Sequence, residues 1–230
     1  MRRAVSLSAA VIAAGLLTGC ISNPPIAFSS DLVARTEAVE VAGIGGSSKG
    51  TFRVGQSQGR FSRSADHVKI DDLHQRNIGG AHFEAIGPDF SGTASGDCNF
   101  DEGQLDWGVA TFSEKRLTYT CAFRLNDRID GPLVLAEVPS GKGALAGVTR
   151  AGELRIDGTT MTVKAVHQFR ENRVRSGQPL GYIFSMSGRE VGAVDLAGRK
   201  TVYLPREPGP ERRAVLMAGV ALLLFWDPGE

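Results

Sequence analysis

The sequence has little net charge and no long apolar run. Its 26 lysines and arginines stand against 25 aspartates and glutamates, without a block of basic residues, so nucleic acid is not an expected partner. The two longest apolar runs, residues 4–17 and 214–226, would form helices of only about 20 Å, whereas a bilayer core measures roughly 30 Å. A hydrophobic content of 42% is nevertheless enough for a folded core, which excludes a disordered chain.

The sequence also lacks a catalytic signature in a suitable context. The string Gly-x-Ser-x-Gly occurs at residues 55–59, with Ser57 at its centre. A nucleophile elbow requires a strand that runs into a helix, but residues 60–63 alternate like a strand, so we expect a polar hairpin turn here. We therefore expect a protein that is not an enzyme and that needs no cofactor.

Metal-binding spacings are absent as well, because no His-Glu-x-x-His or i, i+4 pair of histidines occurs. The densest group of imidazoles and carboxylates lies between residues 67 and 84, and we expect residues 71–80 to form a surface loop. Its members form a weak candidate polar site: His67, Asp71, Asp72, His74 and His82. A second acidic group around residue 98, which includes Glu102, is expected to be solvated, with weak calcium binding as the alternative.

The first twenty residues have three parts: Arg2 and Arg3, the apolar run 4–17, and the small residues Thr18 and Gly19 before Cys20. This order is typical of an export signal that is removed. Residues 17–20, Leu-Thr-Gly-Cys, resemble the lipobox of bacterial lipoproteins in all four places. The resemblance implies a diacylglycerol-cysteine at Cys20, palmitate or a similar acyl chain on its amino group, and transfer to the outer membrane. The alternative is an ordinary secretory signal that ends in cysteine.

The expected domain organisation follows from this start. Residues 1–19 are the signal peptide, residues 20–30 form a lipidated tether with paired prolines, and residues 31–230 form a single β domain. Removal of residues 1–19 leaves 211 residues and changes the net charge from +1 to −1. Three acyl chains would hold the protein permanently on the membrane.

Cys98 and Cys121 remain once Cys20 is assigned to lipid. Disulfides form and persist in an oxidising compartment, so we expect these two cysteines to pair. The alternatives are two free buried thiols or a metal pair.

Short β-branched or aromatic segments, separated by glycine, proline, aspartate or serine, predict about a dozen strands. The Asp157-Gly158 and Ser187-Gly188 pairs are typical of two-residue hairpin turns. The predicted strands cover residues 37–43, 51–55, 59–63, 81–86, 106–112, 116–124, 133–138, 153–156, 159–166, 181–186, 190–195 and 199–204.

Residues 211–226 predict a helix that is apolar on every side, and such a helix must be surrounded by protein or lipid. A barrel of about eleven strands can hold a central helix. We therefore predict an all-β fold, an antiparallel barrel of about a dozen strands that encloses its own C-terminal helix. The alternatives are an open β-sandwich with the helix packed on it, and a membrane-associated helix.

The late hairpin, the segment Gly-Arg-Lys-Thr-Val-Tyr-Leu-Pro at residues 198–205 and the terminal hydrophobic helix resemble the tubby-like barrels. That superfamily includes tubby domains, LURP-one-related proteins and phospholipid scramblases. The resemblance implies the shape of the domain. Neither the basic residues with which tubby domains read phosphoinositides nor the acidic segment of scramblases is present.

These observations together predict a lipoprotein of the outer membrane that faces the periplasm and acts as a non-enzymatic binding or structural module. Its expected partners are the membrane, through the lipid anchor, and an envelope protein or lipid. Because the barrel is filled, a ligand would bind on the surface or at the rim. The alternatives are an envelope hydrolase that uses Ser57 with His67 or His82, and a lipid-handling protein.

Overall fold

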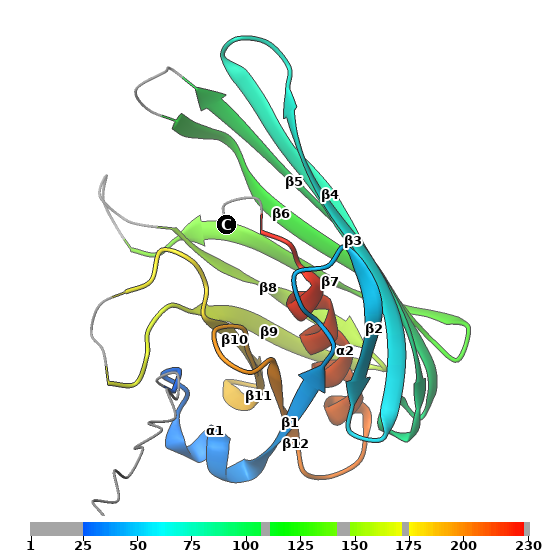
Figure 1. Ribbon diagram of the computed structural model, residues 1–230. Coiled ribbons are helices and arrows are strands. Elements are labelled where there is room, and N and C mark those ends of the chain that lie inside the picture. The colour runs from blue at the N-terminus through cyan, green and yellow to red at the C-terminus, as the bar shows by residue number, and fades with distance from the viewer. Residues whose placement is uncertain (1–24, 107–110, 142–147, 172–174, 228–230) are drawn as a thin grey trace, which may run out of the picture.

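Twelve antiparallel strands form a closed barrel in the computed structural model of the chain, which describes residues 25–106, 111–141, 148–171 and 175–227 (Figure 1). Each strand pairs with the next one in sequence, and β1 closes the barrel by pairing with β12. The predicted barrel is therefore confirmed, and the open sandwich does not form. The strands are β1 (Thr36–Ala42), β2 (Lys49–Val54), β3 (Ser57–Lys69), β4 (His74–Gly87), β5 (Gly92–Asp106), β6 (Thr111–Leu125), β7 (Arg128–Pro139), β8 (Val148–Ile156), β9 (Thr159–Val166), β10 (Gly181–Met186), β11 (Arg189–Asp195) and β12 (Thr201–Pro205).

Alternation of side chains explains why these segments form a barrel wall. Along β9, every second residue from Thr159 to Ala165 is buried and those between are exposed, as expected for a strand with one face on a core. The turn before β9 has Asp157 at φ 53° and Gly158 at φ 73°, and two positive φ angles are what a type I′ hairpin turn requires. The hairpin predicted at this position is confirmed.

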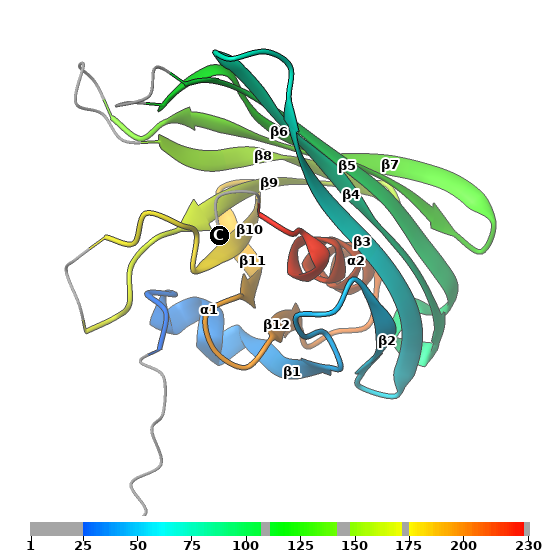
Figure 2. The ribbon, with the colours of Figure 1, turned by 45° about the horizontal axis from the view of Figure 1, so that its top comes forward.

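The helix α2 (Pro210–Leu224) fills the barrel (Figure 2). All its residues from Ala214 to Leu224 are buried, so the helix can be apolar on every side without exposure to water. Gly219 allows it to approach β12 closely, since a Cβ atom there would lie 2.9 Å from the Val202 methyl groups. The predicted enclosed helix is confirmed. In the described part of the chain, no helix combines the length and the apolar character needed to cross a membrane.

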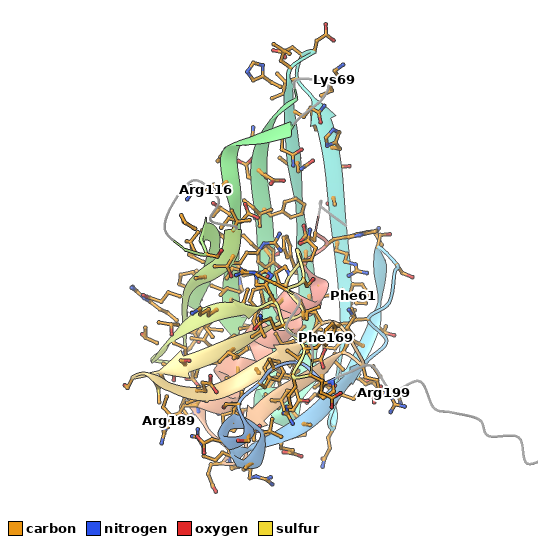
Figure 3. All side chains as sticks on the ribbon, turned by 90° about the vertical axis from the view of Figure 1, so that its left-hand side faces the viewer. Phe61, Lys69, Arg116, Phe169, Arg189 and Arg199 are labelled. Carbon is orange, nitrogen blue, oxygen red and sulfur yellow. A yellow bond between two sulfur atoms is a disulfide. The ribbon has the colours of Figure 1, made fainter. Side chains whose placement is uncertain are left out.

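The two ends of the barrel differ in chemistry. We call the end with the β3–β4, β7–β8 and β9–β10 connections the upper end, at the upper left in Figure 1. The β3–β4 hairpin with Lys69 near its tip extends beyond the rest of the barrel (Figure 3). Phe225, Trp226 and Asp227 follow α2 toward this end, and the Arg63 guanidinium lies 4.8 Å from the centre of the Trp226 ring. The apolar core thus gives way to polar residues above the helix.

Residues 25–35, here called the N-terminal strap, pack against the outside of the barrel. Ile26, Phe28 and Leu32 are buried in a small second apolar cluster with Ala193 of β11. The strap begins at the upper end, because the Arg170 amide in the β9–β10 connection donates to the Pro25 carbonyl. It ends in the short helix α1 (Ser30–Arg35), which the sequence did not predict. Residues 25–30, expected within the tether, are therefore part of the folded domain.

Two predicted boundaries are wrong. The predicted surface loop at residues 71–80 is mostly strand, because β4 begins at His74. The predicted strand at 106–112 contains the β5–β6 connection, and β5 itself was not predicted. The inward positions of β5 include Ala94, Gly96 and Cys98, whose small side chains give a weak strand signal. A single turn of 3-10 helix, η1 (Pro88–Phe90), joins β4 to β5.

Candidate functional site

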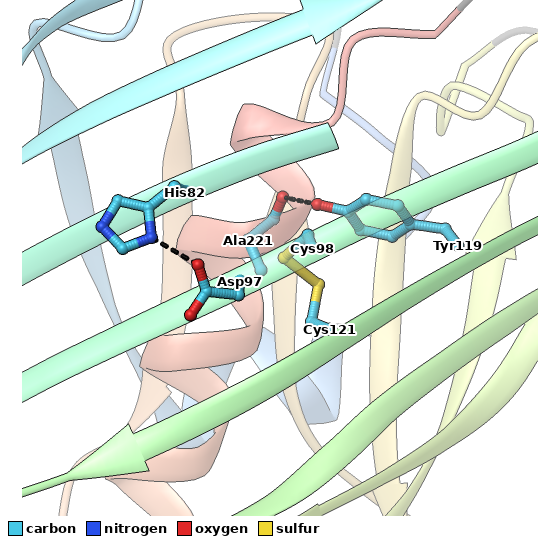
Figure 4. Close-up of a disulfide and its surroundings, with 6 residues drawn as sticks. All are labelled: His82, Asp97, Cys98, Tyr119, Cys121 and Ala221. Atoms are coloured by element: carbon cyan, nitrogen blue, oxygen red, sulfur yellow. Dashed lines mark hydrogen bonds and ion pairs between the residues drawn. A yellow bond between two sulfur atoms is a disulfide. The ribbon is translucent and has the colours of Figure 1, made fainter. Parts of the chain in front are cut away.

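The histidines and aspartates of the predicted polar site do not come together. His67 on β3 lies 2.6 Å from the Asn77 amide oxygen, at the upper end. Within the β3–β4 turn, Asp71 accepts hydrogen bonds from the Leu73 amide and from His74, and these lower the pKa of Asp71 to about 2. Asp72 pairs with Lys69 in the same turn. His82 points to the outer face and contacts Asp97 at 2.6 Å (Figure 4). Strand alternation separates these groups, since His82 and His67 lie on opposite faces of the β3–β4 pair.

Ser57 is not arranged as a nucleophile. Its side chain is 2% exposed, and its hydroxyl donates to the Asp89 carboxylate at 2.8 Å and accepts from the Asp89 amide at 3.0 Å. This exchange ties the β2–β3 turn to η1. Among the described residues, no histidine forms a hydrogen bond with Ser57, so the geometry gives the hydrolase alternative no support.

Cys98 and Cys121 form the predicted disulfide, between directly paired positions of β5 and β6 (Figure 4). The bridge faces the barrel interior, and both cysteines are at most 3% exposed. On the same interior side, the Tyr119 hydroxyl donates to the Ala221 carbonyl of α2 at 2.8 Å. The bridge joins two strands of the wall and the hydrogen bond joins the wall to the helix, and neither cysteine of the described residues is left as a free thiol. Cys20 lies outside the described residues.

The most unusual group of side chains lies above the helix, where charged residues are buried inside the barrel. They surround a cavity of about 230 Å³ at the upper end, here called the rim chamber. Buried ionisable groups are rare unless they are paired or functional. The residues that line the rim chamber with ionisable side chains are Glu102, Glu137, Arg150, His167 and Asp227.

Arg150 is the centre of the rim chamber. It is 6% exposed, and its guanidinium lies 2.5 Å from the Asp227 carboxylate and 3.8 Å from the Glu137 carboxylate. The Phe225 ring lies 5.2 Å from the same guanidinium, within the range of a cation–π contact. Arg150 therefore joins β7, β8 and the segment after α2 at one point.

Glu102 forms the second side of the rim chamber. Its carboxylate accepts from the Asn77 amide at 2.7 Å and from the Gln104 amide at 3.1 Å. Glu102 was expected to be solvated, but it is 9% exposed because it occupies an inward position of β5. Two neutral donors stabilise its charge without cancelling it.

The surroundings of Glu137 disfavour the ionised form of its carboxyl group. Burial raises its pKa, and the Arg150 charge only partly opposes this effect. His167 shows the converse, since burial lowers the pKa of its imidazole and favours the neutral ring. The His167 ring contacts the Thr149 hydroxyl and the Ser176 carbonyl, each at 3.1 Å. With His167 neutral, the three carboxylates of the rim chamber outnumber its one lining guanidinium among the described residues.

Tyr182 adds an unsatisfied group next to this cluster. The residue is fully buried, and its hydroxyl is the one buried side-chain polar atom in the described part of the chain that has no hydrogen-bond partner. Burial raises the pKa of Tyr182, and the nearby Arg150 charge lowers it, although no hydrogen bond of ordinary geometry joins them. A buried hydroxyl without a hydrogen bond lowers the free energy of unfolding by about 1–3 kcal/mol. A gain in stability therefore does not explain why a tyrosine stands at this position.

The sequence did not predict the rim chamber because its residues are far apart in the chain. Arg150 and Asp227, for example, are separated by 77 positions. One signal was available: Arg150 and Glu137 occupy inward positions of their strands, in phase with Leu154 on β8 and Leu135 on β7. A charged residue at such a position predicts a buried polar site.

The chemistry of the rim chamber favours binding of a polar ligand over metal coordination. Within the described ranges, no group of three or more histidine, cysteine, aspartate and glutamate side chains is arranged to hold a metal ion. Its three carboxylates suit hydrogen bonds from a cationic group, and the single lining guanidinium offsets only part of their charge. Comparisons with family models, curated proteins and solved structures find no match to this chain.

Proposed function

We propose that this protein is a lipid-anchored, non-enzymatic binding module of the outer membrane that faces the periplasm. Its ligand site is the rim chamber, and its ligand is a small molecule or side chain that carries an ammonium or guanidinium group. One observation carries this proposal: three carboxylates, two buried and one partly buried, line a cavity of about 230 Å³ that has a single lining guanidinium among the described residues. A cationic ligand would restore the balance of charge.

Electrostatics supports a cationic ligand. A buried carboxylate without a full counter-charge is costly, which is why the pKa of Glu137 is raised. An ammonium group near Glu137 and Glu102 would lower that pKa again, since an opposite charge favours the ionised form. The Tyr182 hydroxyl would gain an acceptor or donor if the ligand reached it, so the ligand would also satisfy the unpaired polar atom.

The position of the N-terminal strap supports a site near the membrane. Residue 25 lies at the upper end, next to Arg170. It is five positions from Cys20, and a fully extended chain of that length spans at most about 17 Å. With a lipid at Cys20, the end of the barrel that carries the rim chamber would therefore stay close to the membrane surface.

Calorimetric titration of the purified protein with agmatine, which carries both a guanidinium and an amine, tests the ligand class. We expect saturable binding at pH 7 and at least tenfold weaker binding by Glu137→Gln, which removes one carboxylate charge but keeps the shape. Glu207→Gln is the matched control, because Glu207 is exposed after β12 and should not affect binding. Absence of agmatine binding, or equal affinity in Glu137→Gln, would contradict the proposed ligand class.

Metabolic labelling with an alkyne analogue of palmitate tests the anchor in a bacterial host. The full chain should incorporate the label, and Cys20→Ser should lose it and appear in the soluble periplasmic fraction. The double variant Cys98→Ser and Cys121→Ser is the control, because loss of the disulfide should leave labelling intact. Equal labelling of Cys20→Ser would refute the lipobox.

A further inference from the structure

A second hollow of the described structure lies on the outside of the barrel, away from the rim chamber. It has a volume of about 900 Å³ and lies against the outer faces of β2 to β6, and we call it the outer groove. The backbones of Ala85 and Ala94 form part of its floor, since the side chains of these two residues face the barrel interior. The rim chamber and the outer groove share no lining residue.

Strand register arranges the side chains of the outer groove in two parallel rows that cross the strands. One row runs from Thr51 through Arg60, Glu84 and Ser95 to Arg124, each residue paired with the next across neighbouring strands. The second row contains Arg53, Gln58, Ile86 and Thr93, paired in the same way. A ligand in the outer groove would therefore lie across the strands, in contact with five of them.

Two arginines at the ends of the outer groove are not neutralised by an acidic side chain of the described residues. Arg53 on β2 and Arg124 on β6 are exposed and form no ion pair with a described residue, whereas Arg60 between them pairs with Glu84 at 2.6 Å. Strands lie about 4.8 Å apart, so four steps from β2 to β6 separate the two backbones by about 19 Å. With Arg60, Glu84 and Asp127 included, the groove has three positive and two negative side chains.

The groove between the arginines is polar. Its outward side chains are mostly hydroxyls and an amide, from Thr51, Gln58, Thr93 and Ser95, and none forms a side-chain hydrogen bond within the described structure. Ile86, at 56% exposed, is the one large apolar side chain that projects from these rows. Peptides are usually held by apolar anchors or by an exposed strand edge, whereas these two rows cross the face of the barrel wall.

We infer that the outer groove binds an acidic oligosaccharide of several sugar units, which lies across β2 to β6. Arg53 and Arg124 contact its carboxylates or phosphates, because a guanidinium matches both groups with two parallel hydrogen bonds. Thr51, Gln58, Thr93 and Ser95 hydrogen-bond to the sugar hydroxyls. This inference does not depend on the lipid anchor or on the rim chamber.

Titration with tetragalacturonate, followed by calorimetry, tests the inference on the full mature protein. We expect binding that weakens as salt rises, since exposed charge pairs are screened. The double variant Arg53→Gln and Arg124→Gln should bind at least tenfold more weakly. The matched control is Arg116→Gln with Arg189→Gln, two exposed arginines that lie outside the groove and should leave affinity unchanged.

Two further ligands test separately whether binding needs the carboxylates and whether it needs several sugar units. The neutral maltotetraose should bind at least tenfold more weakly than tetragalacturonate, because it lacks the carboxylates. Monomeric galacturonate should also bind at least tenfold more weakly, because it cannot reach both arginines. Equal binding of either compound, or unchanged affinity in the double variant Arg53→Gln and Arg124→Gln, would overturn the inference. Agmatine binding at the rim chamber should be the same in both double arginine variants, so the two sites can fail separately.

Discussion

Tyr119 and Tyr182 offer a matched test of the buried polar interior. Both are fully buried tyrosines on the inside of the wall, and substitution by phenylalanine removes one hydroxyl from each. The Tyr119 hydroxyl donates to the Ala221 carbonyl at 2.8 Å, whereas the Tyr182 hydroxyl has no hydrogen-bond partner. The same chemical change should therefore have different consequences at the two positions.

The magnitudes follow from these contacts. Tyr119→Phe should lower the free energy of unfolding by about 1 kcal/mol, the usual net value of a hydrogen bond. The loss stays near this value because the Ala221 carbonyl keeps its helical bond from the Phe225 amide at 3.1 Å. Tyr182→Phe removes a hydroxyl that is buried without a partner, so it should leave stability unchanged or raise it by up to about 1 kcal/mol.

Urea denaturation followed by circular dichroism measures both variants against the wild type, and thermal unfolding should show a shift of roughly 2–4 °C for each kcal/mol. If the rim chamber binds agmatine, Tyr182→Phe should weaken that binding without a loss of stability, and Tyr119→Phe should leave binding intact. Equal destabilisation by the two substitutions would show that the Tyr182 hydroxyl is hydrogen-bonded in the folded protein, and the argument from an unpaired group would be refuted.

Three further substitutions test the core, the disulfide and the rim chamber. Leu222→Ala in α2, where the side chain is 1% exposed, should cost about 3–5 kcal/mol in urea denaturation, and a loss below 1 kcal/mol would mean that the helix is not the core. Replacement of both Cys98 and Cys121 by serine should cost about 3 kcal/mol, and an unchanged urea midpoint would contradict this. Burial lowers the pKa of His167, so stability should fall as pH drops below about 6.5, the ordinary pKa of histidine. His167→Gln should therefore flatten the change in urea midpoint between pH 7 and 5, and an identical slope would exclude this role.

The parts of the fold that the sequence predicted well are those with strong local signals. The predicted bounds of β9 and β10 coincide with the observed ones, because both strands are bordered by turn residues and β9 also alternates. The enclosed helix was predicted because an apolar segment must be buried whatever the topology. A closed barrel then followed from the number of strands and from the need to surround the helix.

The parts that were missed depend on contacts far apart in the chain. The outer halves of β3 and β4 extend beyond the helix, so polar residues such as His67 and Asn77 replace the apolar residues by which a strand is usually detected. Of the rim chamber, only Glu102 was named beforehand, and it was expected in solvent. No local pattern indicates that Asp227 reaches Arg150, since that pair depends on where α2 ends inside the closed barrel.

Closure of the barrel through β1 and β12 also limits the order in which the protein can fold. The chain is made from its N-terminus, so β1 cannot pair with β12 until Pro205 has been synthesised. The helix α2, which fills the barrel, is synthesised later still. Pairing between residues so distant in sequence makes folding slow, and the unfilled wall exposes apolar surface meanwhile. A chain of this design needs protection from aggregation until the fifteen residues of α2 are available. Its stability therefore depends on the last element that the wall receives.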